Sequence, residues 1–239
     1  MLGVAALLVG LAKTSVGGLA TIAVALAAGV MPARESTAAL LLLLLVGDVV
    51  AVSIYRRDGD WRLLARLVPA VLPGLVVGSL VLAVVDDQLL RRGIGALLIC
   101  LVALQLGLSL RPVPGGAPGS APSRSRASAA GLAAGFTTMV ANAGGPVMTL
   151  YLVAQRVDKR RFLGTASWFF LGVNLCKLPF SVGLGLVDRT MVVSTVALAP
   201  VVVLGGIAGA LVVRRMGQRT FDVAVLAASG LSGLALLVR

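Results

Sequence analysis

The sequence predicts an all-α integral membrane protein of about eight helical segments. Three observations carry this prediction. Of the 239 residues, 59% are hydrophobic and only 13% are charged, and the mean hydropathy is +1.03. Long apolar runs recur along the whole chain, and the arginines stand in short clusters between them. A soluble domain of this composition would aggregate, so the chain needs lipid as its solvent.

Several function classes are excluded by the composition. The net charge of +12 would suggest nucleic acid in a soluble protein, but only 4% of the residues are aromatic and the arginines form no single face. The chain has no histidine and no CxxC pattern, so zinc hydrolase chemistry lacks ligands. No Walker pattern is present, so ATP coupling within this chain is not expected. We expect neither an enzyme nor a cofactor or metal. Cys100 and Cys176, inside apolar runs, are predicted to be small buried hydrophobes.

Six runs are long enough to cross the roughly 30 Å hydrocarbon core as helices. They cover residues 38–54, 67–85, 93–110, 162–187, 191–213 and 223–238. Two further runs, 2–30 and 127–157, are each broken by glycine and polar residues. The breaks read Lys13-Thr14-Ser15-Val16-Gly17-Gly18 and Asn142-Ala143-Gly144-Gly145-Pro146. Because Met1-Leu2-Gly3 lacks a basic segment and a cleavage site, we expect the first run to remain in the mature protein.

A linker divides the chain near its midpoint. Residues 111–126 combine four prolines with glycine and serine, which is typical of an extended, solvated segment. On either side the same pattern recurs, because a Gly-Gly pair is followed about twenty residues later by Ser36-Thr37-Ala38 and by Gly164-Thr165-Ala166. We therefore predict two homologous transmembrane repeats, residues 1–110 and 127–239, joined by the linker 111–126.

The positive-inside rule distinguishes two topologies. If all eight runs cross the membrane, Lys and Arg divide 10 to 9 between the two sides, which gives no orientation. If the two broken runs return as re-entrant hairpins, the division is 14 to 5, with both termini outside. Each half then has three spans and one hairpin, and the odd number of spans inverts the second half relative to the first. We predict this inverted repeat, with tilted, kinked full spans as the alternative.

The two breaks predict a lined cavity, because unpaired backbone groups at membrane depth are costly unless protein or water satisfies them. Glycine lets backbone approach a ligand closely, and half-helices that start near Leu19 or Val147 would present free N–H groups to an anion. The alternative is that these glycines only allow tight helix packing.

Three charged residues lie inside apolar segments, where an unpaired charge is costly. An ammonium group of Lys13 or Lys177 that faces the cavity would neutralise a bound anion; the alternatives are a structural ion pair or snorkelling to an interface. Asp48 is predicted to pair with a lysine, with a role in proton coupling as the alternative. The candidate substrate-binding residues are Lys13, Thr14, Ser15, Gly17, Gly18, Thr138, Asn142, Gly144, Gly145, Asn174 and Lys177.

Several motifs together resemble a known family over nearly the whole chain. In the second half these are Gly135-Phe136, Asn142-Ala143-Gly144-Gly145-Pro146, Tyr151-Leu152, Asp158-Lys159-Arg160-Arg161-Phe162, Gly164-Thr165, Asn174 and Lys177, and in the first half Gly10-Leu11-Ala12-Lys13 with Gly17-Gly18. The chain resembles the sulfite exporter TauE/SafE family, also called the toluene sulfonate uptake permease family. The first half departs by lacking a fuller glycine run and by a proline displaced to Pro32. The resemblance implies a duplicated transporter of small anions such as sulfite, sulfoacetate and other organosulfonates.

The leading hypothesis is a secondary transporter that exports a small anion by alternating access at a midplane site formed by the Lys13 and Asn142 breaks. A passive anion channel and a non-transporting membrane scaffold are the alternatives. We expect a multi-pass protein of the cell (plasma or inner) membrane, whose partners are the lipid bilayer and a small anionic substrate. The sequence leaves the oligomeric state open, a homodimer included.

Overall fold

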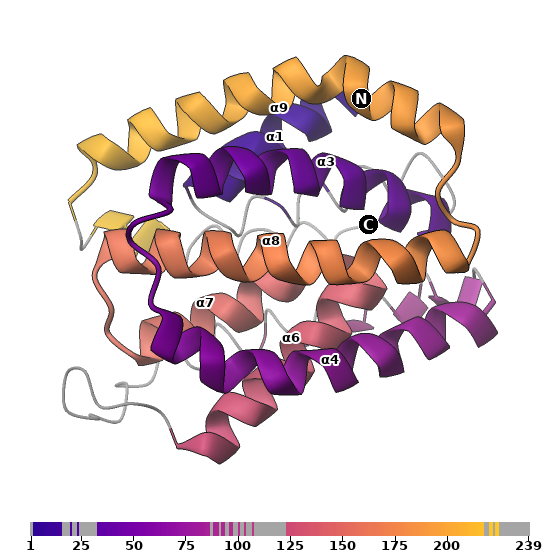
Figure 1. Ribbon diagram of the computed structural model, residues 1–239, viewed down its shortest axis with the longest axis horizontal. Helices are drawn as coiled ribbons and strands as arrows, with labels where there is room; N and C mark the ends of the chain where they lie inside the picture. The colour runs from indigo at the N-terminus through magenta and orange to yellow at the C-terminus, as the bar shows by residue number, and fades with distance from the viewer. Residues whose placement is uncertain are drawn as a thin grey trace.

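The protein is a bundle of helices that run alongside one another (Figure 1). The computed structural model describes residues 2–15, 33–86 and 123–217, with scattered positions in 20–23, 88–107 and 220–224. These residues contain helices and connecting loops and no strand. The helices are α1 (Leu2–Thr14), α3 (Ala33–Tyr55), α4 (Trp61–Val84), α6 (Arg124–Ala141), α7 (Gly144–Ala154), α8 (Lys159–Gly183) and α9 (Arg189–Arg215). The predicted all-α fold is confirmed.

Four of the six predicted spans coincide with long helices. Helices α3, α4 and α9 contain segments long and apolar enough to cross a membrane, and α8, with 25 residues, covers the span predicted at 162–187. The runs at 93–110 and 223–238 lie largely outside the described residues. The chain is therefore a multi-pass membrane protein.

Lipid as the solvent explains one difference from the sequence-based expectation. Cys100 and Cys176 are both exposed rather than buried. In a membrane protein the outer surface faces hydrocarbon, so a small apolar side chain is as favourable there as in the interior. Apolar sequence context thus predicts a dry environment, which need not be the inside of the bundle.

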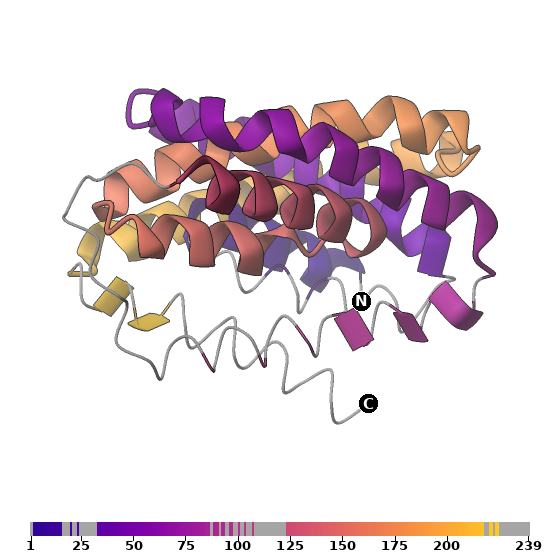
Figure 2. The same ribbon diagram turned by 90° about the horizontal axis from the view of Figure 1, so that it is seen from below.

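The second broken run folds as a hairpin. Helix α6 ends at Ala141, and Asn142 adopts a left-handed conformation with φ of 50°. Helix α7 then runs back toward the end of the bundle at which α6 begins (Figures 1 and 2). It starts at Gly144, earlier than the predicted Val147, because Pro146 then falls in the first helical turn, where its missing N–H is not needed.

The first broken run is described up to its break. Helix α1 continues through Lys13 and Thr14, so these two residues form its last turn rather than part of the break. With 13 residues, α1 reaches only about 20 Å, well short of the roughly 30 Å core. Gly17 and Gly18 lie outside the described residues.

Two similar helix–helix contacts join the first half of the chain to the second. Helix α1 packs along α9, and α4 packs along α6. Both crossings are lined by glycines: a Cβ on Gly135 in α6 would lie 3.1 Å from the backbone nitrogen of Leu75 in α4, and one on Gly205 in α9 would lie 3.1 Å from that of Leu11 in α1. Glycine permits this backbone approach because it has no side chain to separate the helices.

The loop between α3 and α4 packs against α8 at one end of the bundle. Asp60 caps α4, and its second carboxylate oxygen pairs with Arg161 at 3.1 Å. The rings of Trp61 and Trp168 lie beside this pair, with centroids 5.2 Å apart. The arginine-rich segments 56–66, 156–161 and 214–215 all lie at this end, which we call the basic end (left in Figure 1). If residues 127–157 form a hairpin, the segments 56–66 and 156–161 lie on the same side of the membrane, as observed. If residues 127–157 crossed the membrane once, these two segments would lie on opposite sides.

Candidate functional site

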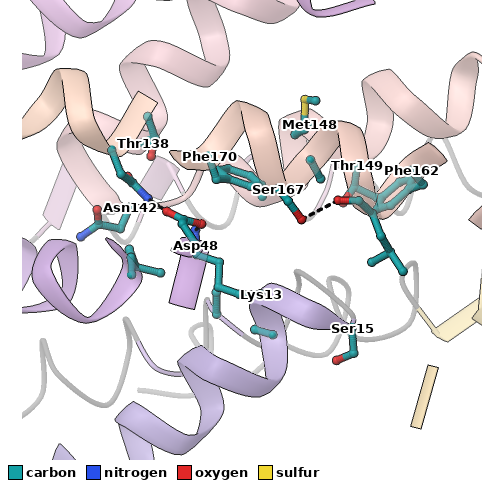
Figure 3. A pocket seen from close by; sticks show the side chains of 17 residues that line it. Lys13, Ser15, Asp48, Thr138, Asn142, Met148, Thr149, Phe162, Ser167 and Phe170 are labelled. Atoms are coloured by element: carbon teal, nitrogen blue, oxygen red, sulfur yellow. Dashed lines mark hydrogen bonds and ion pairs between the residues drawn. The ribbon is translucent and has the colours of Figure 1, made fainter. Parts of the chain in front are cut away.

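A cavity of about 50 Å³ lies where the end of α1 meets α3, the α6–α7 break and α8 (Figure 3). Its wall contains one ammonium group, one carboxylate and several amide and hydroxyl groups in a largely apolar surround. The lining residues are Ala12, Lys13, Ser15, Ala20, Leu44, Asp48, Thr138, Asn142, Gly145, Met148, Thr149, Phe162, Leu163, Ala166, Ser167, Phe170 and Asn174. We call it the central cavity.

Lys13 and Asp48 form a buried ion pair in the cavity wall. The Lys13 Nζ lies 2.6 Å from Oδ1 of Asp48, and the two side chains are 8% and 0% exposed. The amide of Asn174 donates from Nδ2 to Oδ2 of Asp48 at 2.6 Å, so one carboxylate oxygen faces the ammonium group and the other an amide. The same ammonium group lies 4.4 Å from the centroid of the Phe170 ring, a cation–π contact. Helices α1, α3 and α8 are thus joined at one charged point.

Asn174 leaves one polar atom without a partner. With its Nδ2 directed at Asp48, its Oδ1 is buried and accepts no hydrogen bond among the described residues. Reversing the amide would set Oδ1 against the carboxylate, so the ion pair fixes the orientation. A buried acceptor without a donor costs about 1–3 kcal/mol, which a ligand with an O–H or N–H group would recover.

Lys177 and Asn142 connect α8 to the α6–α7 break. The Lys177 Nζ donates to the carbonyl oxygen of Thr138 at 2.6 Å and also to Oδ1 of Asn142. The Asn142 Nδ2 donates to the carbonyl oxygen of Thr37 in α3 at 2.9 Å. Asparagine tolerates the left-handed conformation better than most residues, and here its side chain also spans two helices. The break is therefore held rigidly between α3 and α8.

Helix α7 presents its N-terminus at the cavity. Ala143, which precedes the first turn, offers no side chain to accept from the free N–H groups of that turn. Gly145 of the first turn lines the cavity. These N–H groups and the positive end of the helix dipole favour an anion.

The structure brings most of the predicted site residues together, but not all of them line the cavity. Seven do: Lys13, Ser15, Asp48, Thr138, Asn142, Gly145 and Asn174. Lys177 is fully buried behind Asn142. Thr14 points to α9, where its hydroxyl donates to the carbonyl oxygen of Gly206 at 2.7 Å. Gly144 lies beside the cavity against Thr138 and Phe170, and Gly17 and Gly18 lie outside the described residues.

Sequence reasoning missed several residues of α7 and α8 that line the cavity. Phe170, Ser167 and Thr149 line it, and Figure 3 shows Phe170 beside Asp48. The Ser167 hydroxyl donates to the carbonyl oxygen of Leu163 at 2.7 Å, so it leaves its oxygen to accept from a ligand. Nothing distinguishes these residues in sequence, because each lies in a run of ordinary apolar helix.

The end of α1 is held by a tyrosine. The Tyr55 hydroxyl donates to the carbonyl oxygen of Thr14 at 2.8 Å, one of the carbonyls that the helix end leaves free. We expect Tyr55→Phe to lower the free energy of unfolding by about 1 kcal/mol, the value of a typical hydrogen bond. Tyr151→Phe is the matched control, because its bond to the carbonyl oxygen of Leu63 is longer, at 3.3 Å. Thermal unfolding in detergent measures both, and an equal loss in the two variants would contradict the prediction.

Comparisons with known proteins agree with this architecture. The family model described as sulfite exporter TauE/SafE matches residues 2–236. None of the curated proteins and none of the solved structures matches the chain.

Proposed function

Because this chain belongs to the sulfite exporter TauE/SafE family, which makes it a membrane transporter, we propose that it is a secondary transporter of a small anion. Sulfite or an organosulfonate of the sulfoacetate kind is the proposed substrate, and export is the proposed direction. The central cavity is the proposed binding site, used by alternating access from the two sides of the membrane.

The excess of positive charge at the central cavity carries this proposal. Lys13 places an ammonium group in the cavity wall and Lys177 adds a second basic side chain behind Asn142, whereas Asp48 is the only buried carboxylate among the described residues. A net positive charge in a low-dielectric site is costly unless an anion joins it. The N-terminus of α7 adds further positive potential at Gly145. An anion in the central cavity would therefore complete the electrostatic balance.

The size of the central cavity supports a small oxyanion. One water needs roughly 10–15 Å³ of such space, so about 50 Å³ accepts a group of only a few heavy atoms. The free Oδ1 of Asn174 would accept from an O–H group, as a protonated oxyanion would offer. Neutral donors and a single ammonium group would hold the oxygens without binding them too tightly for release.

The arrangement of the halves supports alternating access. The α6–α7 hairpin opens toward the basic end, whereas α1 enters from the opposite end (Figure 1). The glycine-lined crossings α1 with α9 and α4 with α6 have equivalent places in the two proposed repeats, 1–110 and 127–239. A site between two such units can be exposed to either side by a rocking motion of one unit. We place the basic end in the cytoplasm of the cell or inner membrane, with the termini outside.

Flux measurements in proteoliposomes test the proposal. Purified protein is reconstituted, and the uptake and efflux of sulfite, sulfoacetate and several carboxylates are followed with and without a pH gradient. Saturable flux that responds to the gradient is expected for a coupled transporter. Non-saturating, voltage-dependent flux would identify a passive channel instead. No flux of any tested anion would favour a scaffold role and overturn the proposal.

A further inference from the structure

A second and larger cavity opens at the basic end. It has a volume of about 600 Å³ and is formed by the end of α3, the following loop, the start of α8 and the end of α9. We call it the basic vestibule. Its lining residues are Ser53, Ile54, Tyr55, Arg56, Arg57, Asp58, Lys159, Arg160, Leu163, Val213 and Arg214.

The basic vestibule is strongly positive. Five of its lining residues are cationic and only Asp58 is acidic. Lys159 is fixed there, because its Nζ donates to the carbonyl oxygens of Val213 at 2.9 Å and Met216 at 2.5 Å. The positive-inside bias explains arginines in these loops, but it does not require three separate loops to converge on one cavity. A concave surface with this charge concentrates small anions from the solution.

One side chain belongs to both cavities. Leu163, in the first turns of α8, lines the basic vestibule and the central cavity and is 4% exposed. Its neighbour Phe162 also lines the central cavity. An apolar side chain between two cavities excludes water and ions from the path between them.

We propose that the basic vestibule is the entrance through which the anion passes between the cytoplasm and the central cavity, and that Leu163 is the barrier between the two. This inference rests on the proposed function, because it concerns the route to the same site. In the conformation described here the barrier is closed, with the ion pair of Lys13 and Asp48 on its inner side. Moving Leu163 aside would join the two spaces.

Thiol accessibility tests the barrier without requiring transport. In a background with Cys100→Ser and Cys176→Ser, the variant Ser167→Cys places a thiol in the central cavity. Inverted membrane vesicles expose the cytoplasmic face to a negatively charged methanethiosulfonate reagent. Leu163→Ala is expected to raise the rate of Ser167→Cys modification about tenfold. Leu163→Val should raise it less, because valine is closer to leucine in size and blocks more of the path.

A change of the same kind elsewhere on α8 provides the control. Leu175 lies on the outer surface of the bundle, 52% exposed, and lines neither cavity. Leu175→Ala should leave the modification rate unchanged. Equal rates in the Leu163 variants and their parent, or an equal rise with Leu175→Ala, would overturn the role of Leu163.

The charge of the basic vestibule is tested with the same thiol. Arg57→Gln with Arg160→Gln should slow the anionic reagent about tenfold in the Leu163→Ala background, while a cationic reagent reacts no more slowly. An unchanged ratio of the two rates would show that the basic vestibule is not the route. Thiol labelling reports access to the central cavity and not transport. If the labelling rates do not change as expected while anion flux is intact, the proposed route is wrong. If the labelling rates change as expected but no anion flux is found, the proposed function is wrong.

Discussion

Lys13→Ala is expected to abolish anion flux and to destabilise the protein. The substitution removes the ammonium group at the central cavity and leaves Asp48, which is 0% exposed, without its ion-pair partner. Removing one partner of a buried pair costs about 3–5 kcal/mol, because the remaining charge is uncompensated. Proteoliposome flux and thermal unfolding in detergent measure the two effects.

A double variant separates the two effects. Lys13→Ala with Asp48→Asn removes the uncompensated carboxylate, so most of the lost stability should return. Anion flux should not return, because the ammonium group in the wall of the central cavity is still missing. Wild-type flux in the stable double variant would show that the substrate does not bind beside Lys13. Recovery of neither property would mean that the ion pair is needed chiefly for folding.

Gly135→Ala is expected to destabilise the protein strongly although it adds a single methyl group. A Cβ at this position would lie 3.1 Å from the Leu75 nitrogen and would also meet the Val71 carbonyl oxygen inside contact distance. Both atoms are backbone, so α4 and α6 must separate, at a cost of about 3 kcal/mol or more. Gly205→Ala should behave in the same way at the α1–α9 crossing, where it meets Leu7 and Leu11.

Gly172→Ala is the matched control for these variants. It lies in the middle of α8, and a Cβ there would have nothing within 4 Å. Alanine is the better helix former by about 1 kcal/mol, so this variant should be slightly stabilised. The same chemical change is therefore expected to lower the melting temperature at Gly135 and to raise it slightly at Gly172. A loss of similar size at Gly135 and Gly172 would show that the close crossing is not what the protein depends on.

The sequence was most informative where a residue type conflicts with its surroundings. Lys13, Asp48 and Asn142 are costly in apolar segments, and the conflict alone directed attention to the cavity that they line. The hairpin of α6 and α7 was predicted from the positive-inside rule, because eight full crossings would divide Lys and Arg almost evenly between the two sides of the membrane. Both patterns exist in the sequence whatever the tertiary structure.

The remaining features depend on which surfaces meet. Lys177 is as costly as Lys13, yet it is turned away from the cavity and holds Asn142 in place. Phe170 covers the Lys13 ammonium only because α8 passes over the end of α1. Periodicity shows that both residues belong to a helix, but not which neighbour each one faces. The central cavity could thus be predicted from its charges, but its apolar wall could not.

The two crossings also set an order for synthesis in the cell. Helix α1 leaves the ribosome nearly two hundred residues before its backbone partner α9, and α4 must wait for α6. During that interval Lys13 has not yet met the Phe170 ring of α8, and the face of α1 that carries Gly10 has not yet met α9. Both crossings join an early helix to a late one, so the packed bundle cannot form before α6 and α9 have been inserted. A product truncated before α9 therefore lacks the backbone partner of α1.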